Sequence, residues 1–427
     1  MGNKLFAVVL ASGLMTPTLT LADSSFVTIY GRVSADFENV KASGGATPAN
    51  DIPSRNRISS NSSYIGFRGK EELGAGVNAI FQIESGVAVD NGASSTGSGT
   101  FATRNSNVGL SSNSLGTVFY GNWETPYRIT TKVLDPFYAI SVFTAYRAIF
   151  GTPGGNVNSS PTGSATTGGA SAAGFGRREN NSIQYWTPNY HGLSGRVAYE
   201  VNEGRSNTSA GNTVNPYLWS LAVTYDQGPY YLSVGYERHR DFLVPTAATP
   251  QAAFPLGLGT PTRSQDSGVR VGAGYTTEAT GLGKTRLVAG YERLTYNTSG
   301  AASGAFVNSF DKNNYFVGVS HKIGGNILRT SYAQANDGSC TFTNGSACST
   351  AGLGAKAFNV GYGYSLSKRT EVYVAYVRIL NDAGAAYNFG QNAIGATVAG
   401  SATAGFTGGI GAGADPTGYG LGIIHLF

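Results

Sequence analysis

Long apolar runs are missing from this sequence beyond its first 22 residues, so no later stretch could form a membrane-spanning helix. Cysteine and methionine occur only twice each, and just 12% of the 427 residues are charged. The basic residues are scattered rather than gathered into a stripe, which argues against a nucleic-acid partner. The four histidines lie in distant segments without metal-ligand spacing, so we expect neither a metal ion nor another cofactor. No serine and histidine form a local catalytic pair, and we do not expect an enzyme.

The sequence instead repeats one pattern, in which short segments alternate apolar and polar side chains between Gly, Asn, Asp and Ser turns. In residues 26–37, Val27, Ile29, Val33 and Phe37 fall on one face and polar residues on the other. Because side chains alternate across a strand, each segment is a ribbon with one apolar and one polar face. Strands that are apolar outside and polar inside are typical of a transmembrane β-barrel, and we predict an all-β antiparallel one.

Short and long connections alternate along the chain, and they set the number of strands. Seven short turns and eight long connections predict sixteen strands, and this number leaves an aqueous lumen. An even count with long loops on one side predicts a multi-pass barrel in the outer membrane of a Gram-negative bacterium. The short turns are 73–76, 113–116, 188–193, 226–229, 276–284, 324–325 and 366–369.

The first 22 residues have the pattern of a secretory signal peptide. Lys4 gives a positive start, Leu5–Leu14 form a short apolar core, and Thr20–Ala22 form a small-residue cleavage site. The apolar stretch is shorter than the roughly 20 residues that a membrane helix needs. We therefore expect a signal peptide at 1–22 and a single barrel domain at 23–427.

The two cysteines, Cys340 and Cys348, lie close together in a polar segment. A secreted protein reaches an oxidising compartment, where such a pair forms a disulfide. A metal site is the alternative, with Asp337 as the one other ligand nearby.

The longest connection follows Trp123, and its first half, Tyr127–Phe150, is rich in aromatic and aliphatic residues. An apolar segment of this kind is unfavourable in water at a loop tip. We expect it to pack against the wall inside the barrel.

Several blocks of the sequence together resemble the general porins of Gram-negative outer membranes. The matching blocks are 25–31, 64–74, 79–84, 104–110, 115–127, 181–185 and 425–427. The resemblance implies a trimeric sixteen-stranded barrel whose third loop folds into the lumen and narrows it. It also implies that Phe427 is recognised by the outer-membrane insertion machinery. The alternative for Phe427 is a lipid-facing aromatic residue without a recognition role.

The family resemblance carries over some of the residues that line the pore constriction. Arg104 and Arg178 match wall positions that are basic in the family, whereas Tyr64 and Asn122 stand where many members have arginine. The expected wall is therefore less basic than usual, and we predict a weak anion preference. The candidate constriction residues are Arg32, Tyr64, Arg68, Arg104, Glu124, Asp135 and Arg178.

The sequence therefore predicts a water-filled channel for passive diffusion of small hydrophilic solutes and ions. Its expected partners are these solutes, the lipid bilayer with its lipopolysaccharide, and two further copies of the chain. Two alternatives stay open. One is a channel selective for a sugar or an organic anion, in which tyrosines form a stacking track. The other is a surface adhesin.

Overall fold

A computed structural model describes most of the chain. The described residues are 26–48, 51–90, 101–137, 143–154, 174–207, 213–243, 261–301, 307–345, 348–390, 392–394 and 410–427. The expected signal peptide at 1–22 lies outside them.

The described chain is nearly all β-structure, with two short helices. The helices are α1 (Pro126–Lys132) and α2 (Ala145–Ile149). No helix in the described residues has the length and apolar character needed to cross a membrane. The strands are β1 (Phe26–Ser43), β2 (Ile52–Ser60), β3 (Tyr64–Gly74), β4 (Val77–Gly86), β5 (Ser106–Ser112), β6 (Gly116–Glu124), β7 (Arg178–Trp186), β8 (Leu193–Glu200), β9 (Ser206–Asn207), β10 (Thr213–Val214), β11 (Tyr217–Gln227), β12 (Tyr230–Arg240), β13 (Pro261–Ala279), β14 (Gly283–Ala301), β15 (Val307–Ile323), β16 (Asn326–Ala335), β17 (Ser339–Phe342), β18 (Ala355–Ser365), β19 (Thr370–Asn381) and β20 (Asp415–Leu426).

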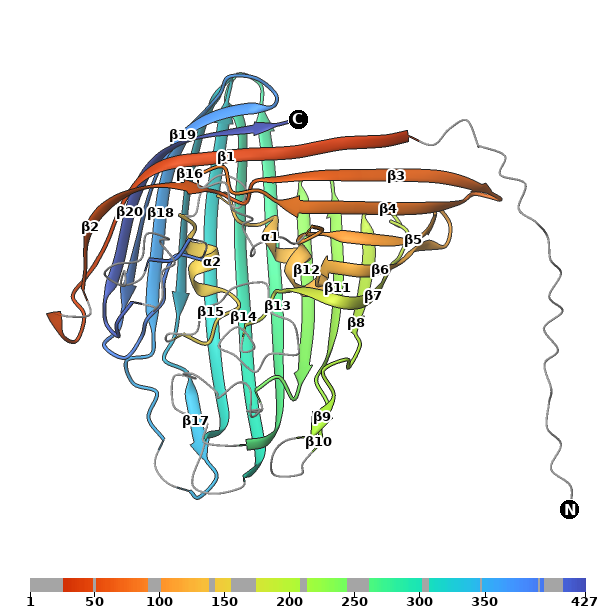
Figure 1. Ribbon diagram of the computed structural model, residues 1–427. Helices are drawn as coiled ribbons and strands as arrows, with labels where there is room; N and C mark the ends of the chain where they lie inside the picture. The colour runs from red at the N-terminus through yellow and green to blue at the C-terminus, as the bar shows by residue number, and fades with distance from the viewer. Residues whose placement is uncertain are drawn as a thin grey trace, which may run out of the picture.

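All strands except the β9–β10 ribbon belong to one antiparallel sheet of eighteen strands, which closes where β20 pairs with β1 (Figure 1). β2 and β3 pair with β1 one after the other and form a single barrel strand interrupted at 61–63. β16 and β17 pair with β15 in the same way around an interruption at 336–338. With each of these two pairs counted once, the barrel has sixteen strands, which confirms the prediction.

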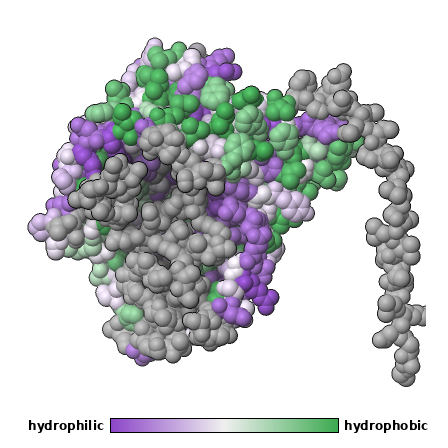
Figure 2. Space-filling view, viewed as in Figure 1, coloured by the Kyte–Doolittle hydropathy of each residue, from purple (hydrophilic) through white to green (hydrophobic). Residues whose placement is uncertain are grey.

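The alternation of side chains has the predicted orientation. In β1, Val27 and Ile29 are 61% and 59% exposed on the outer face, whereas Arg32 and Asp36 are 7% and 2% exposed on the inner face. Figure 2 shows hydrophobic side chains gathered at the end of the molecule where the short turns of Figure 1 lie. The outer face is therefore suited to lipid and the inner face to water.

Several strands are longer than the alternation predicted. The alternation was traced over residues 26–37, whereas β1 continues to Ser43 and a further strand, β2, covers Ile52–Ser60. In these extensions many outward side chains are polar, because β-structure that projects beyond the lipid faces water on its outside. The turn predicted at 276–284 is also shorter, since β13 ends at Ala279 and β14 begins at Gly283.

The predicted disulfide joins Cys340, in β17, to Cys348 in the loop that follows, with Cα atoms 5.8 Å apart. It closes a short loop beside the end of the barrel that bears the long connections. The cysteines therefore have a structural role rather than a metal-binding one.

The last residue completes the closure of the barrel. The backbone N–H of Gly31 donates to the carbonyl of Phe427 at 3.0 Å, and the N–H of Phe427 donates back at 3.1 Å. A side chain at position 31 would collide with the Phe427 ring, since a Cβ atom there would lie 2.4 Å from Cζ. The glycine therefore lets the terminal ring cover the seam between the first and last strands.

Deleting Phe427 should impair refolding into lipid vesicles, because it removes both hydrogen-bond partners of Gly31 at the membrane, where lipid supplies none. Phe427→Leu keeps both backbone bonds and serves as the control. We expect a several-fold lower folded fraction for the deletion, measured by heat-dependent electrophoretic mobility, and a fraction near the wild-type value for Phe427→Leu. Equal refolding of all three proteins would contradict this role.

Candidate functional site: the inner loop and the facing wall

The connection between β6 and β7, residues 125–177, is here called the inner loop, and its two helices lie within the barrel (Figure 1). α1 packs mainly on β11 and β12, and α2 packs on β16 and β18. Tyr127, Leu134, Phe143 and Ile149 are at most 1% exposed. The prediction that the apolar half of this loop packs against the inner wall is confirmed for its described residues.

Glu292 of β14 is the main polar anchor of the inner loop. Its carboxylate accepts hydrogen bonds from the Tyr127 hydroxyl at 2.8 Å and from the backbone N–H of Gly151 at 2.7 Å. Arg270 of β13 donates to the same carboxylate at 2.6 Å and to the Thr131 hydroxyl at 3.0 Å. One buried ion pair therefore ties both ends of the helical part of the loop to the wall.

A second anchor holds the middle of the loop. The side-chain amide of Asn359, in β18, donates to the carbonyl of Phe143 at 2.8 Å. Asp135 accepts from the Thr144 hydroxyl at 2.5 Å and from the Phe137 N–H at 3.0 Å. Burial raises the pKa of Asp135 from 3.8 to about 6. Asp135 is therefore buried within the loop itself, where its carboxylate stabilises the conformation of the loop.

Glycines of the wall make room for the side chains of the loop. A Cβ atom at Gly361 would lie 2.7 Å from Cε1 of Phe137, and one at Gly272 would lie 2.3 Å from Cδ1 of Leu134. These contacts are closer than van der Waals packing permits, so a larger residue would push the loop into the lumen.

The wall of β1 to β5 carries a file of basic residues on its inner face, here called the basic ladder. Arg57 pairs with Glu38 at 2.5 Å, and Arg32 donates to the carbonyls of Asn61 and Ser62 at 3.1 and 2.9 Å. Arg32 shares its face of β1 with Glu38. The ladder consists of Arg55, Arg57, Arg32, Arg104, Arg68 and Lys70.

Tyr64 holds two members of the basic ladder. The guanidinium carbons of Arg104 and Arg32 lie 4.8 and 5.7 Å from the centre of its ring. Arg104 also pairs with Glu84 at 2.5 Å. Tyr64 further interacts electrostatically with Lys132 of α1, which approaches from the inner loop. Tyr64 therefore positions charges of the wall, although it carries none itself.

Glu124, at the end of β6, forms ion pairs with three basic residues at the base of the loop. It pairs with Arg128 at 3.2 Å, with Arg178 at 3.5 Å and closely with Lys132. The Glu124 side chain is 3% exposed, whereas those of Lys132 and Arg104 are 26% and 19% exposed. Glu124 is thus covered, whereas Lys132 and Arg104 are the more accessible partners of these ion pairs.

The structure brings most of the predicted constriction residues together. Arg32, Tyr64 and Arg104 form one cluster on the wall, and Glu124 and Arg178 form another at the base of the loop. Arg68 lies on the same wall with its guanidinium carbon 5.0 Å from the centre of the Tyr30 ring. Asp135 is 6% exposed, and its side chain bonds to Thr144 and Phe137 of the loop rather than to these charged residues. Their roles in conduction remain predictions.

Two groups of lumen residues escaped the sequence analysis. Arg55 and Arg57 lie in β2, a strand that the sequence analysis did not identify. Phe119, Trp123 and Trp186 form an aromatic group inside the barrel, with ring centres 5.2 to 6.0 Å apart. Tyr120 faces outward, and side chains alternate along a strand. This alternation could have identified Phe119 and Trp123 as inward-facing residues.

No group of three or more histidine, cysteine, aspartate or glutamate side chains in the described residues could hold a metal ion.

Comparisons with known proteins add sequence evidence. A model of the family described as Gram-negative porin matches residues 7–384. The chain is 26% identical to an outer membrane porin of Bordetella pertussis over 323 residues, which cover 73% of this chain and 75% of the relative. It is 26% identical to outer membrane porin protein 32 of Delftia acidovorans over 426 residues, which cover 99% and 98%.

Among solved structures, the chain is similar to an anion-selective porin from Comamonas acidovorans. The two share 25% sequence identity with a TM-score of 0.64, and the match covers 94% of this chain and 100% of that one.

Gly361→Ala should displace the inner loop, because its Cβ atom would overlap the Phe137 ring and approach the Val374 carbonyl to 3.0 Å. Overpacking of this kind costs about 1–3 kcal/mol. We expect a lower midpoint for thermal loss of the folded electrophoretic form and a lower single-channel conductance. Gly290→Ala is the control, since its Cβ atom would lie 3.6 Å from Phe150. If both variants keep the wild-type conductance and midpoint, the glycines are not needed to seat the loop.

Proposed function

This chain belongs to the Gram-negative porin family and is an outer-membrane channel for passive diffusion, and we propose that the basic ladder and the inner loop form its constriction. The residues that would line it are Arg32, Tyr64, Arg68, Arg104, Glu124, Lys132 and Arg178. Small hydrophilic solutes and ions would pass between the ladder and α1, limited by size. Relatives of this chain are channels rather than enzymes.

The main support for an anion preference is the unequal exposure of acids and bases. Glu84 and Glu124 have side chains that are 8% and 3% exposed, and both are paired with arginine. Arg104 and Lys132 meet the water more fully. An anion entering the constriction would therefore meet cationic groups first, while the paired acids would keep the net field modest. The Comamonas porin to which this chain is similar is anion-selective.

Reversal potentials across a salt gradient in planar bilayers would test this proposal. The wild-type protein should conduct in steps and show a weak anion preference. Arg104→Glu should move the reversal potential toward cations, because it places a negative charge beside Glu84 where screening by bulk salt is weak. Lys356→Glu makes the same charge change at an exposed site near the long loops and should leave the reversal potential nearly unchanged.

Two results would speak against the proposal. If Arg104→Glu and Lys356→Glu shift the reversal potential equally, Arg104 is not at the constriction. If the folded protein never conducts, the channel assignment itself fails.

We propose further that the chain assembles as a homotrimer, as its family resemblance implies. Native mass spectrometry of the detergent-extracted protein would detect a single subunit if this is wrong. We also propose that the Phe427 side chain is recognised by the insertion machinery and that the long loops lie among lipopolysaccharide. A Phe427→Leu protein that refolds in vitro but accumulates poorly in the outer membrane of cells would support the recognition role.

A further inference from the structure

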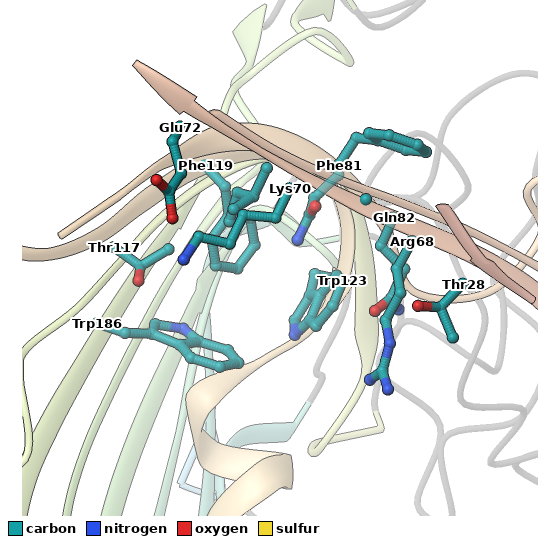
Figure 3. Close-up of a pocket in the computed structure, with 13 residues that line it drawn as sticks. Thr28, Arg68, Lys70, Glu72, Phe81, Gln82, Thr117, Phe119, Trp123 and Trp186 are labelled. Carbon is teal, nitrogen blue, oxygen red and sulfur yellow. The ribbon is translucent and has the colours of Figure 1, made fainter. Parts of the chain in front are cut away.

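A cavity of about 710 Å³ opens on the inner face of β3 to β7, near the short turns (Figure 3). Its lining combines the aromatic group Phe119, Trp123 and Trp186 with the cations Arg68 and Lys70. A volume of this size is typical of pockets for small organic ligands. It lies on the short-turn side of Arg104 and Tyr64, so a solute that has passed the constriction would reach it.

Large aromatic side chains are out of place on a wall that only has to face water. Phe119 is 1% exposed, and its ring centre lies 5.2 Å from that of Trp123 and 5.4 Å from that of Trp186. In Figure 3, Trp123 and Trp186 project from β6 and β7 into the space that Lys70 and Arg68 flank. The Arg196 guanidinium lies 4.9 Å from the centre of the Trp186 ring and holds it in place. The group therefore offers rigid aromatic surface to a solute.

The two cations of the cavity differ from those of the constriction. Arg104, Arg128 and Arg178 each pair with a carboxylate. Among the ion pairs and hydrogen bonds of the described residues, Arg68 and Lys70 have no carboxylate partner. Arg68 and Lys70 are exposed to the lumen, whereas the Trp123 indole N–H is buried and has no acceptor in the described part of the chain. The cavity thus combines aromatic surface with two cations and a single carboxylate, Glu72, so that its lining carries a net positive charge.

We propose that this cavity binds small aromatic carboxylates, with the ring against the tryptophans and the carboxylate at Arg68 and Lys70. The inference rests on the proposed channel function and adds a solute class to it. Glu72 also lines the cavity and reduces its net positive charge, which favours a monoanion over a dianion. A sugar would use the aromatic faces but would gain little from two unpaired cations, so the charge selects the carboxylate.

The tryptophan content of the chain allows a direct test. The sequence has three tryptophans, and the third, Trp219, lies 43% exposed on the outer face of β11. Trp219→Phe therefore leaves only the two cavity reporters. Fluorescence of the folded, detergent-solubilised protein would be titrated with 4-nitrobenzoate and with 4-nitrobenzyl alcohol. The two quenchers have the same nitrophenyl group and differ in charge. The double variant Trp123→Phe/Trp186→Phe keeps only Trp219 on the outer face. It measures how much a quencher dissolved in the detergent micelle lowers tryptophan fluorescence without entering the cavity.

We expect saturable quenching by 4-nitrobenzoate in Trp219→Phe, with half-saturation at a concentration roughly tenfold below that of the alcohol. In the Trp219→Phe background, Arg68→Gln/Lys70→Gln should remove most of that difference. Lys284→Gln/Lys322→Gln removes the same charge from exposed residues beside other short turns and should preserve it.

Two results with the Trp219→Phe protein alone would overturn the proposal. One is quenching that does not saturate, and the other is the same half-saturating concentration for 4-nitrobenzoate and 4-nitrobenzyl alcohol. An unchanged difference in the Arg68→Gln/Lys70→Gln protein would overturn the assigned cations. Conductance of the same Trp219→Phe protein in potassium chloride separates this inference from the channel function. A conducting protein without saturable quenching refutes the cavity alone, and a binding protein that never conducts refutes the channel alone.

Discussion

The backbone's need for hydrogen-bond partners in lipid is the constraint on which the rest of this structure depends. Lipid cannot satisfy a free strand edge, so the sheet must close, and here β20 closes it against β1 up to the Gly31–Phe427 pair. Closure by sixteen strands creates an interior too wide for wall side chains alone to fill. That surplus space is what the inner loop occupies.

The inner loop turns a wide barrel into an asymmetric pore because it is fixed to one side only. Its apolar residues pack on the glycine-lined wall of β11 to β20, and the buried Arg270–Glu292 pair holds its backbone. The opposite wall therefore faces the loop across water, and its charges need not be buried by packing. This division explains why the basic ladder lies on β1 to β5, while the most deeply buried ion pairs lie beneath or beside the loop.

The alternation of residues predicted the barrel, because lipid on one side of a strand and water on the other impose opposite polarities. The strand number came from the alternation of short and long connections, and the inner loop from its apolar residues and the family resemblance. The prediction failed where that contrast ends, in β2 around Arg55, where water lies on both sides. The candidate site was recovered less completely. Parity could place Arg32 and Arg68 inside, and the family resemblance supplied Arg104, but neither could reveal that Asp135 would be covered by its own loop. Nor could they show that Tyr64 would hold two arginines, since such contacts depend on how distant strands and the loop pack.

The placement of charge along the pore suggests how conduction and binding are kept apart. In the proposed constriction, Arg104 and Lys132 are each paired with an acid, so an anion would gain little by stopping there. Past it, Arg68 and Lys70 lie beside aromatic rings and have no carboxylate partner among the described ion pairs. A solute with both a ring and a negative charge would gain binding free energy from the aromatic side chains and from the cations. A chloride ion has no ring to use there and is attracted only by charge that water screens. The same lumen can therefore conduct simple ions rapidly and retain one class of organic anion, provided that the two tasks occur at successive depths.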